Sequence, residues 1–261
     1  MVKIHFLGTC AGTEPQPNRR HSSLVVEYQD RLFWFDAGES CGYTAHMMGL
    51  DLLKTNAVFI SHPHMDHIGG LPHLVWVIKK LESRSLQANA REIELHLPAA
   101  EIWEGLKLML FLKGRTLDQG IGFSPKRITD GMIYHEAGFK VTAVHNLHLG
   151  TPAPGGSWQS FSFLIEAGGK RIIYSGDFKE MAELEPLFDL GPVDLLLVET
   201  GHHTVEEICS HVVRQGKTVA SIGFTHHGRA VLDDPGAELA KAQAIFGPKV
   251  FLAEDQTTMT P

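Results

Sequence analysis

The chain has 261 residues, of which 43% are hydrophobic and 20% are charged, and its formal net charge is −7. This composition indicates a folded globular protein, and the negative balance gives no general attraction to nucleic acid. The small, odd number of cysteines disfavours a disulfide framework, and no apolar run reaches the roughly 20 residues that span a bilayer. The start, MVKIHFLGTCAG, does not resemble a signal peptide, so we expect a cytoplasmic protein without a membrane partner.

The first half of the chain alternates β-rich runs with helical periodicity. Strands are predicted at Val2–Leu7, Ser23–Glu27, Arg31–Phe35, Ala57–Ile60 and Glu92–Leu97. Apolar residues at helical spacing predict a helix over about 67–86. A second helix is predicted in AAEIWEGLKLMLFLKG, with Gly114 as its C-terminal stop.

The second half repeats this alternation. Strands are predicted at Phe139–Val144, Phe161–Glu166, Arg171–Ser175, Leu195–Glu199 and Thr218–Phe224, and helices at Val205–Gln215 and Gly236–Phe246. The stretch HLGTPAPGGSWQS is typical of a loop. Because the sequence contains no low-complexity linker and no short repeat, we expect a single α/β domain over residues 1–261.

The segment NAVFISHPHMDHIGGLP concentrates polar chemistry between an apolar run and a glycine pair. Side chains of a strand alternate between its faces, so His62 and His64 point the same way if the strand geometry continues. Asp66 and His67 follow where the loop enters a helix. Imidazole and carboxylate groups are good ligands for zinc, manganese or iron, and the spacing therefore predicts part of a metal site.

A local quartet cannot complete two metal sites, so further ligands must come from elsewhere in the chain. Candidates lie just past β-like runs, where strand ends deliver side chains to one rim. VTAVHNLHLG offers His145 or His148, RIIYSGDF offers Asp177, and VASIGFTHHG offers His226 or His227.

The motif His62-Pro63-His64-Met65-Asp66-His67 resembles the signature of the metallo-β-lactamase fold hydrolases, and the match covers nearly the whole chain. FLGTCAGTEP and the FDAGES turn around Asp36 resemble the ribonuclease Z-like and phosphodiesterase branch, and SGD resembles the family's bridging-aspartate motif. The resemblance implies a four-layer αββα sandwich with a binuclear site on one edge. It assigns one metal to His62, His64 and His148 and the other to Asp66, His67 and His226, with Asp177 as the bridge. His148 is preferred to His145, and His226 to His227, by their positions relative to the family's strands.

The stretch LLLVETGHHTVEEI also resembles the ribonuclease Z-like branch. The resemblance makes His202 the functional imidazole and Glu199 its orienting partner, with His203 as the alternative imidazole. Thr204 is expected to cap the next helix, with Glu207 at the capping-box position.

The resulting interpretation is a binuclear metal-dependent hydrolase. Two divalent ions, expected to be zinc with manganese or iron as alternatives, would share a hydroxide that attacks phosphorus. Asp66 would act within this centre, and protonated His202 would donate to the leaving oxygen.

Charge separates the candidate substrates. The interval Gly150–Gly156 contains no lysine or arginine, where ribonuclease Z-like enzymes carry a basic arm. We therefore expect a phosphodiesterase acting on a small or short phosphodiester. The alternatives are a tRNA 3′-processing endoribonuclease, with RNA as its partner, and an ester, lactone or thioester hydrolase. A homodimer is compatible with the sequence.

Overall fold

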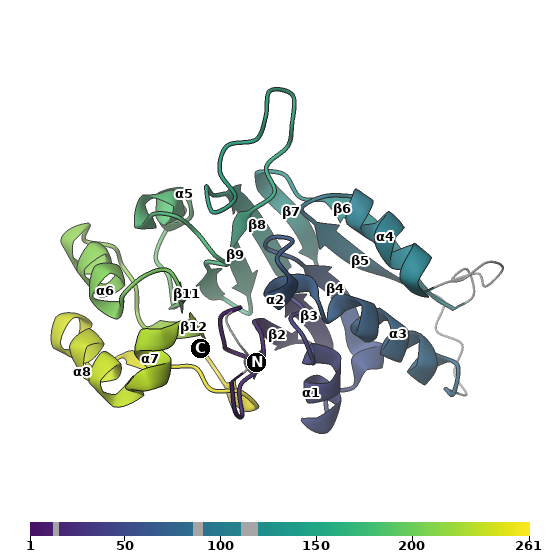
Figure 1. The fold of residues 1–261 in the computed structure, drawn as a ribbon, viewed down its shortest axis with the longest axis horizontal. Helices are drawn as coiled ribbons and strands as arrows, with labels where there is room; N and C mark the ends of the chain where they lie inside the picture. Colours follow the sequence, from purple (N-terminus) through teal and green to yellow (C-terminus); the bar gives the residue numbers. More distant parts are fainter. Residues whose placement is uncertain (13–15, 86–90, 111–119) are drawn as a thin grey trace.

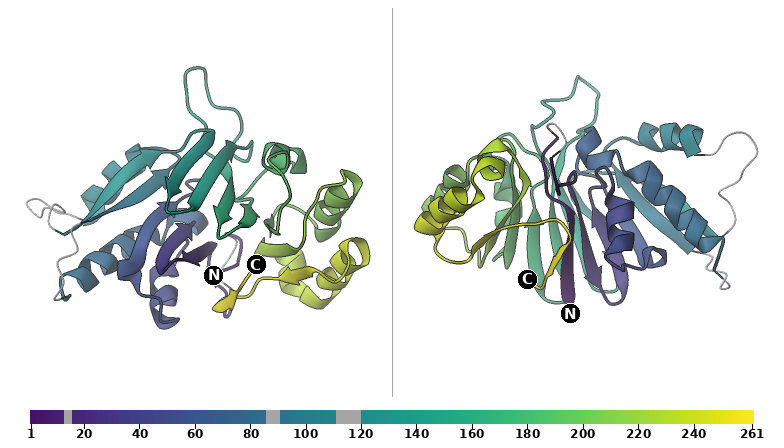
Figure 2. Two further views of the ribbon diagram at one scale, coloured as in Figure 1. Left: turned by 180° about the vertical axis from the view of Figure 1, so that it is seen from behind. Right: turned by 60° about the horizontal axis from the view of Figure 1, so that its bottom comes forward.

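The computed structural model describes residues 1–12, 16–85, 91–110 and 120–261. Within these residues, two seven-stranded sheets pack face to face, and helices cover the outer face of each sheet (Figure 1). The two further views show the same arrangement of helix, sheet, sheet and helix (Figure 2). The predicted four-layer αββα sandwich is therefore confirmed. No helix in the described ranges is both long enough and apolar enough to cross a membrane.

The first sheet is built mainly from the N-terminal half, in the order β14-β1-β2-β3-β4-β5-β6. Strands β3 to β6 run parallel to one another. Its strands are β1 (Val2–Gly8), β2 (Ser23–Tyr28), β3 (Arg31–Phe35), β4 (Thr55–Phe59), β5 (Arg91–Leu97), β6 (Ile121–Arg127) and β14 (Thr257–Met259). The helices of this half are α1 (Cys41–Met47), the 3-10 helix η1 (Leu52–Lys54), α2 (Met65–Ile68), α3 (Leu71–Glu82) and α4 (Glu101–Leu110).

The second sheet has the order β13-β12-β11-β10-β9-β8-β7, and its strands β10 to β13 are parallel. Its strands are β7 (Gly131–Glu136), β8 (Phe139–His145), β9 (Phe161–Ala167), β10 (Lys170–Tyr174), β11 (Leu195–Thr200), β12 (Ile222–His227) and β13 (Val250–Leu252). Its helices are the 3-10 helix η2 (Met181–Leu184), α5 (Glu185–Phe188), α6 (Val205–Arg214), α7 (Arg229–Asp233) and α8 (Pro235–Phe246).

An aromatic-rich core joins the two sheets. Phe33 of the first sheet and Phe139 of the second stack with ring centroids 3.6 Å apart, and Phe35 contacts Phe163 edge to face. Separate apolar cores lie between each sheet and its own helices. Because the central strands bury side chains on both faces, their sequences are close to continuously apolar, which explains why they were predictable.

Several predicted boundaries were wrong. The predicted helix over 67–86 is two helices, α2 and α3, because the chain turns at Gly69 and Gly70. A Cβ on Gly70 would lie 2.1 Å from the Gly38 carbonyl oxygen, so only glycine allows this close approach. The strand predicted from Thr218 begins at Ile222, since residues before it form a turn and an isolated bridge to Val193. The predicted helix ends at residue 86 and at Gly114 lie outside the described residues.

Candidate metal centre

Four strand ends deliver the candidate ligands to one rim of the sandwich. His62 follows β4, His148 follows β8, Asp177 follows β10, and His226 lies near the end of β12. Side chains at the ends of such strands converge even when they are far apart in sequence. For example, Oδ2 of Asp66 lies 3.1 Å from Nε2 of His226, although the two residues are 160 positions apart.

The first group of candidate ligands is His62, His64 and His148, whose ligand atoms all lie within 4.8 Å of one another. His64 Nδ1 and His148 Nε2 are 3.2 Å apart. His62 is fully buried, whereas His64 is exposed and His148 is half-buried. This group therefore has one fixed imidazole and two that lie nearer to solvent.

The second group is Asp66, His67, Asp177 and His226, again with ligand atoms within 4.8 Å. Asp177 Oδ1 lies 3.3 Å from His67 Nε2, and its Oδ2 lies 3.4 Å from His226 Nε2. The same Oδ2 is 3.8 Å from His62 Nε2. Asp177 thus contacts both groups, which is the position that a bridging carboxylate requires.

Several buried atoms of the two groups lack hydrogen-bond partners among the described residues. They include Nε2 of His62, Nε2 of His67 and Oδ1 of Asp177. Buried polar atoms normally find a partner because an unpaired one costs free energy. Three such atoms facing one another, all on nitrogen or oxygen groups that bind divalent metals, fit a site for metal ions.

The electrostatics of the centre favour a bound cation. Burial and the neighbouring His67 charge lower the pKa of His62 well below its ordinary value. Against the effect of burial, Asp177 and Asp36 raise the pKa of His67, and Asp177 and Asp66 raise that of His226 to about 9. Carboxylates that stabilise a protonated imidazole in this way would equally stabilise a metal ion.

A buried carboxylate outside both groups holds the centre in place. Asp36 Oδ2 accepts hydrogen bonds from His67 Nδ1 at 2.7 Å, Ser61 Oγ at 2.8 Å and Tyr174 OH at 2.7 Å. Its Oδ1 accepts the backbone N–H of Ser61 at 2.6 Å. Bonding to Nδ1 of His67 leaves Nε2 free to face the second group, which is how carboxylates orient metal-binding histidines.

A tight turn presents Asp177. Gly176 has φ 55°, and a Cβ there would lie 2.8 Å from Ser61 Cβ and 2.9 Å from the Phe161 carbonyl oxygen. Glycine is therefore required on both conformational and steric grounds. The sequence signal for this position was the SGD motif itself.

His202 and Glu199 form a pair at the edge of the centre. Glu199 is buried and accepts from His202 through both oxygens, at 2.9 and 3.0 Å from Nδ1. This hydrogen bond raises the pKa of His202, which is exposed on the rim. His202 Nδ1 is also 3.8 Å from Asp177 Oδ2. His202 and Glu199 form a third metal-capable group with Asp177 and His226, so the imidazole adjoins the second group. The capping box of Thr204 and Glu207 is present at the start of α6.

The alternative histidines lie elsewhere. His145 bonds Asp130 and stacks on Trp158. His203 stacks on Phe178 and lies with Nε2 3.1 Å from its carbonyl oxygen, while His227 Nε2 lies 2.8 Å from the carbonyl oxygen of Ala253. None of the three belongs to a metal-capable group found among the described residues.

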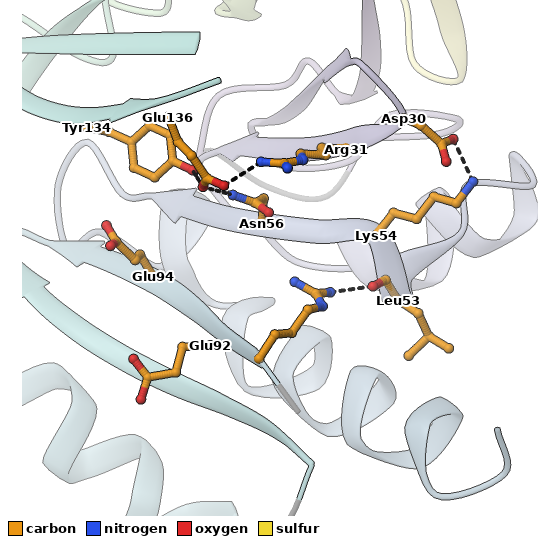
Figure 3. Close-up of a pocket in the computed structure, with 10 residues that line it drawn as sticks. Asp30, Arg31, Leu53, Lys54, Asn56, Glu92, Glu94, Tyr134 and Glu136 are labelled. Carbon is orange, nitrogen blue, oxygen red and sulfur yellow. Dashed lines mark hydrogen bonds and ion pairs between the residues drawn. The ribbon is translucent and has the colours of Figure 1, made fainter. Parts of the chain in front are cut away.

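A cavity of about 480 Å³, whose lining is drawn in Figure 3, lies where the parallel strands β3, β4 and β5 begin, at the edge of the sandwich opposite the rim. Its polar groups largely satisfy one another. Arg31 pairs with Glu136, Lys54 pairs with Asp30, and Arg91 donates to backbone carbonyl groups. Because its cations are already engaged, this cavity is a weaker candidate for a reactive site than the metal-capable rim.

Solved structures with the same fold support the class. The chain superposes on the metallo-β-lactamase fold protein YhfI from Bacillus subtilis with a TM-score of 0.75 at 19% identity, covering 99% of this chain and 98% of that one. The short form of human tRNase Z matches with a TM-score of 0.70 at 20% identity, covering 99% and 98%. The chain therefore has the metallo-β-lactamase fold, as predicted.

The particular family follows from the sequence comparison. The chain belongs to the family described as Anti-Pycsar protein Apyc1, which matches residues 2–197. A ribonuclease Z from Lactobacillus delbrueckii subsp. bulgaricus is 34% identical over 146 residues, which are 54% of this chain and 43% of that protein. The chain therefore aligns with less than half the length of this relative. The resemblance to the ribonuclease Z-like branch is confirmed.

Proposed function

We propose that the protein is a binuclear metal-dependent phosphodiesterase that acts on a small or short phosphodiester. The observation that carries the proposal is the convergence at one rim of buried atoms of His62, His67 and Asp177 that make no hydrogen bond within the described residues. His62, His64 and His148 would hold one ion, Asp66, His67 and His226 the other, and Asp177 would contact both. When bound, two divalent ions, expected to be zinc, supply an activated water and neutralise charge on the phosphate oxygens.

The residues around the ions have separate tasks. Asp36 fixes the ring of His67, and Glu199 fixes the ring of His202. The hydrogen bond to Glu199 raises the pKa of His202 and so favours its protonated form, which would donate a proton to the leaving oxygen. Its exposed position on the rim leaves room for a substrate to approach.

A small substrate is favoured by charge. Binding a tRNA-sized ligand requires several phosphate contacts and produces a steep salt dependence. The chain carries a net charge of −7, and the loop Gly150–Gly156 that projects beyond the sheets has no basic residue (Figure 1). A small diester needs only the metal centre and one or two further polar contacts.

A second candidate, endonucleolytic processing of tRNA 3′ ends, is favoured by the 34% identity to a protein named ribonuclease Z. Metal-loaded protein should be assayed on bis(p-nitrophenyl) phosphate, on precursor tRNA, and on an ester and a lactone, each at low and high salt. We expect turnover of the small diester with little salt dependence. Efficient, salt-sensitive cleavage of precursor tRNA with negligible diester turnover would instead establish the nuclease, and turnover of only the ester or lactone would exclude both.

A further inference from the structure

Glu183, in the 3-10 helix η2, connects the two loops that carry His148 and Asp177. Its Oε2 accepts the backbone N–H of Leu147 at 3.2 Å and that of Lys179 at 3.0 Å. Leu147 precedes His148, and Lys179 lies two positions after Asp177. One carboxylate oxygen therefore holds the backbone beside a ligand of the first group and the backbone beside the bridging ligand.

The two loops differ in how else they are held. On the Asp177 loop, the N–H of Phe178 also donates to Glu199 at 3.4 Å. On the His148 loop, Asn146 Oδ1 accepts the N–H of His148 at 3.1 Å, a bond within the loop itself. Beyond residue 148 the chain enters the projecting loop.

The His148 loop is also held through Asn146, whose backbone N–H donates to the Ser160 carbonyl oxygen and whose Nδ2 donates to Ser162 Oγ. His148 Nε2 itself lies 3.8 Å from Asp177 Oδ2. Among these contacts, it is the Glu183 carboxylate that bonds the backbone of both ligand loops.

The other oxygen of Glu183 indicates that the residue has a role besides stability. Oε1 is buried and makes no hydrogen bond within the described parts of the chain. A buried carboxylate with an unpaired oxygen carries a free-energy cost. The residue is therefore poorly explained as a purely stabilising contact.

We infer that Glu183 is a positioning residue for the first metal group, one that sets the distance between His148 and Asp177 through their backbones. The inference rests on the proposed binuclear function. Loss of the two hydrogen bonds to Glu183 should weaken metal binding by the group that contains His148. It should leave the other group largely intact, because His67 and His226 are buried on secondary structure and Asp177 is also held through Glu199.

The test separates the reach of the side chain from its charge. Glu183→Asp keeps the charge but shortens the side chain, whereas Glu183→Gln keeps the length and an oxygen acceptor. Glu180→Asp is the matched control, since Glu180 is an exposed residue at the start of the same helix. Purified proteins would be stripped of metal and titrated with Co²⁺ and Zn²⁺ against a competing chelator, with the visible absorption of cobalt reporting each group.

We expect E183D to weaken one of the two ions about tenfold, in the range seen for residues that orient metal ligands. E183Q and E180D should stay close to wild type, and the melting temperature of the metal-free proteins should change little. Two ions of unchanged affinity in E183D would overturn the inference. So would equal weakening of both ions with a lower metal-free melting temperature, which indicates a merely structural role. A wild type that binds no metal would overturn the proposed function as well, and is recognised before any variant is compared.

Discussion

The two polar edges of the sandwich both contain carboxylates, but these have different neighbours: histidines at the metal-capable rim, and arginine, lysine, tyrosine and asparagine at the opposite edge. At the metal-capable rim, buried atoms of His62, His67 and Asp177 face one another without hydrogen bonds among the described residues. At the opposite edge, Tyr134 OH donates to Glu136 at 2.6 Å and accepts from Asn56 at 2.5 Å, and Arg31 pairs with Glu136.

This comparison distinguishes polar groups that stabilise the fold from polar groups that are left able to bind a ligand. The opposite edge joins β7 of one sheet to β3 and β4 of the other, so its network closes the sandwich (Figure 3). Within the described residues, the rim retains buried nitrogen and oxygen atoms that make no hydrogen bond and that are suited to bind a metal ion. Cavity volume favours the opposite edge, whereas the buried atoms without hydrogen bonds favour the rim.

The strongest test of the comparison is removal of one ligand from the rim. His67→Ala should lower the metal content and reduce kcat/KM for the small diester by about 10³ or more, because both the ion and its charge stabilisation are lost. Elemental analysis and steady-state kinetics would measure these effects. Full metal content with intact activity would show that the unpaired atoms do not mark a metal centre.

The next largest effect is expected at His202. His202→Ala should cut kcat by roughly 10²–10⁴ while KM changes little, since the imidazole would act on the leaving group. Metal content should remain at the wild-type level. His203→Ala is the matched control, and damage confined to that variant would show that the neighbouring histidine is the functional one.

Asp36 tests whether the rim depends on the carboxylate behind it. Asp36→Asn keeps the size but weakens the bond to His67 Nδ1, so metal affinity should fall about 10- to 100-fold. Tyr174→Phe removes a different bond to the same carboxylate and should have a smaller effect. Chelator competition would measure both, and unchanged affinity in Asp36→Asn would exclude the orienting role.

At the opposite edge, a change should affect stability alone. Tyr134→Phe removes the hydroxyl that joins Glu136 and Asn56, and the free energy of unfolding should fall by about 1 kcal/mol. Metal content and kcat/KM should be unchanged. Denaturant titration and activity assays would show this, and a loss of activity without a loss of stability would contradict the division between the two edges.

The smallest expected effect is on pH dependence. The hydrogen bond from Tyr134 is the main reason why the pKa of Glu136 lies below its ordinary value of 4.5. A lowered pKa means that ionised Glu136 stabilises the fold above pH 4.5, and that this stabilisation is lost as pH falls through the folded-state pKa. Glu136→Gln should therefore flatten the acid side of the stability profile slightly. An unchanged profile would show that the network does not depend on this charge.

The sequence predicted the layers and the central strands because strands that are buried on both faces appear in it as continuous hydrophobic runs. It also indicated the candidate ligands, since His62 to His67 are contiguous and the others follow strand-like runs. It could not indicate the residues that hold them. Tyr174 meets Asp36 across 138 positions, and Glu183 acts on backbone amides that leave no signature in sequence. The break between α2 and α3 was missed because it depends on contact of Gly70 with a distant carbonyl group.

The separation of Asp66 from His226 along the chain bears on how the protein matures. Their 160-position interval includes most of the second sheet, so the second group cannot be complete until both sheets have packed together. Pairing over such distances is slow compared with the formation of local helices. During synthesis, the emerging SHPHMDHIGG segment would present its histidines long before their partners exist. We therefore expect metal insertion to be a late event that selects molecules already folded, and partially synthesised chains to bind ions only weakly.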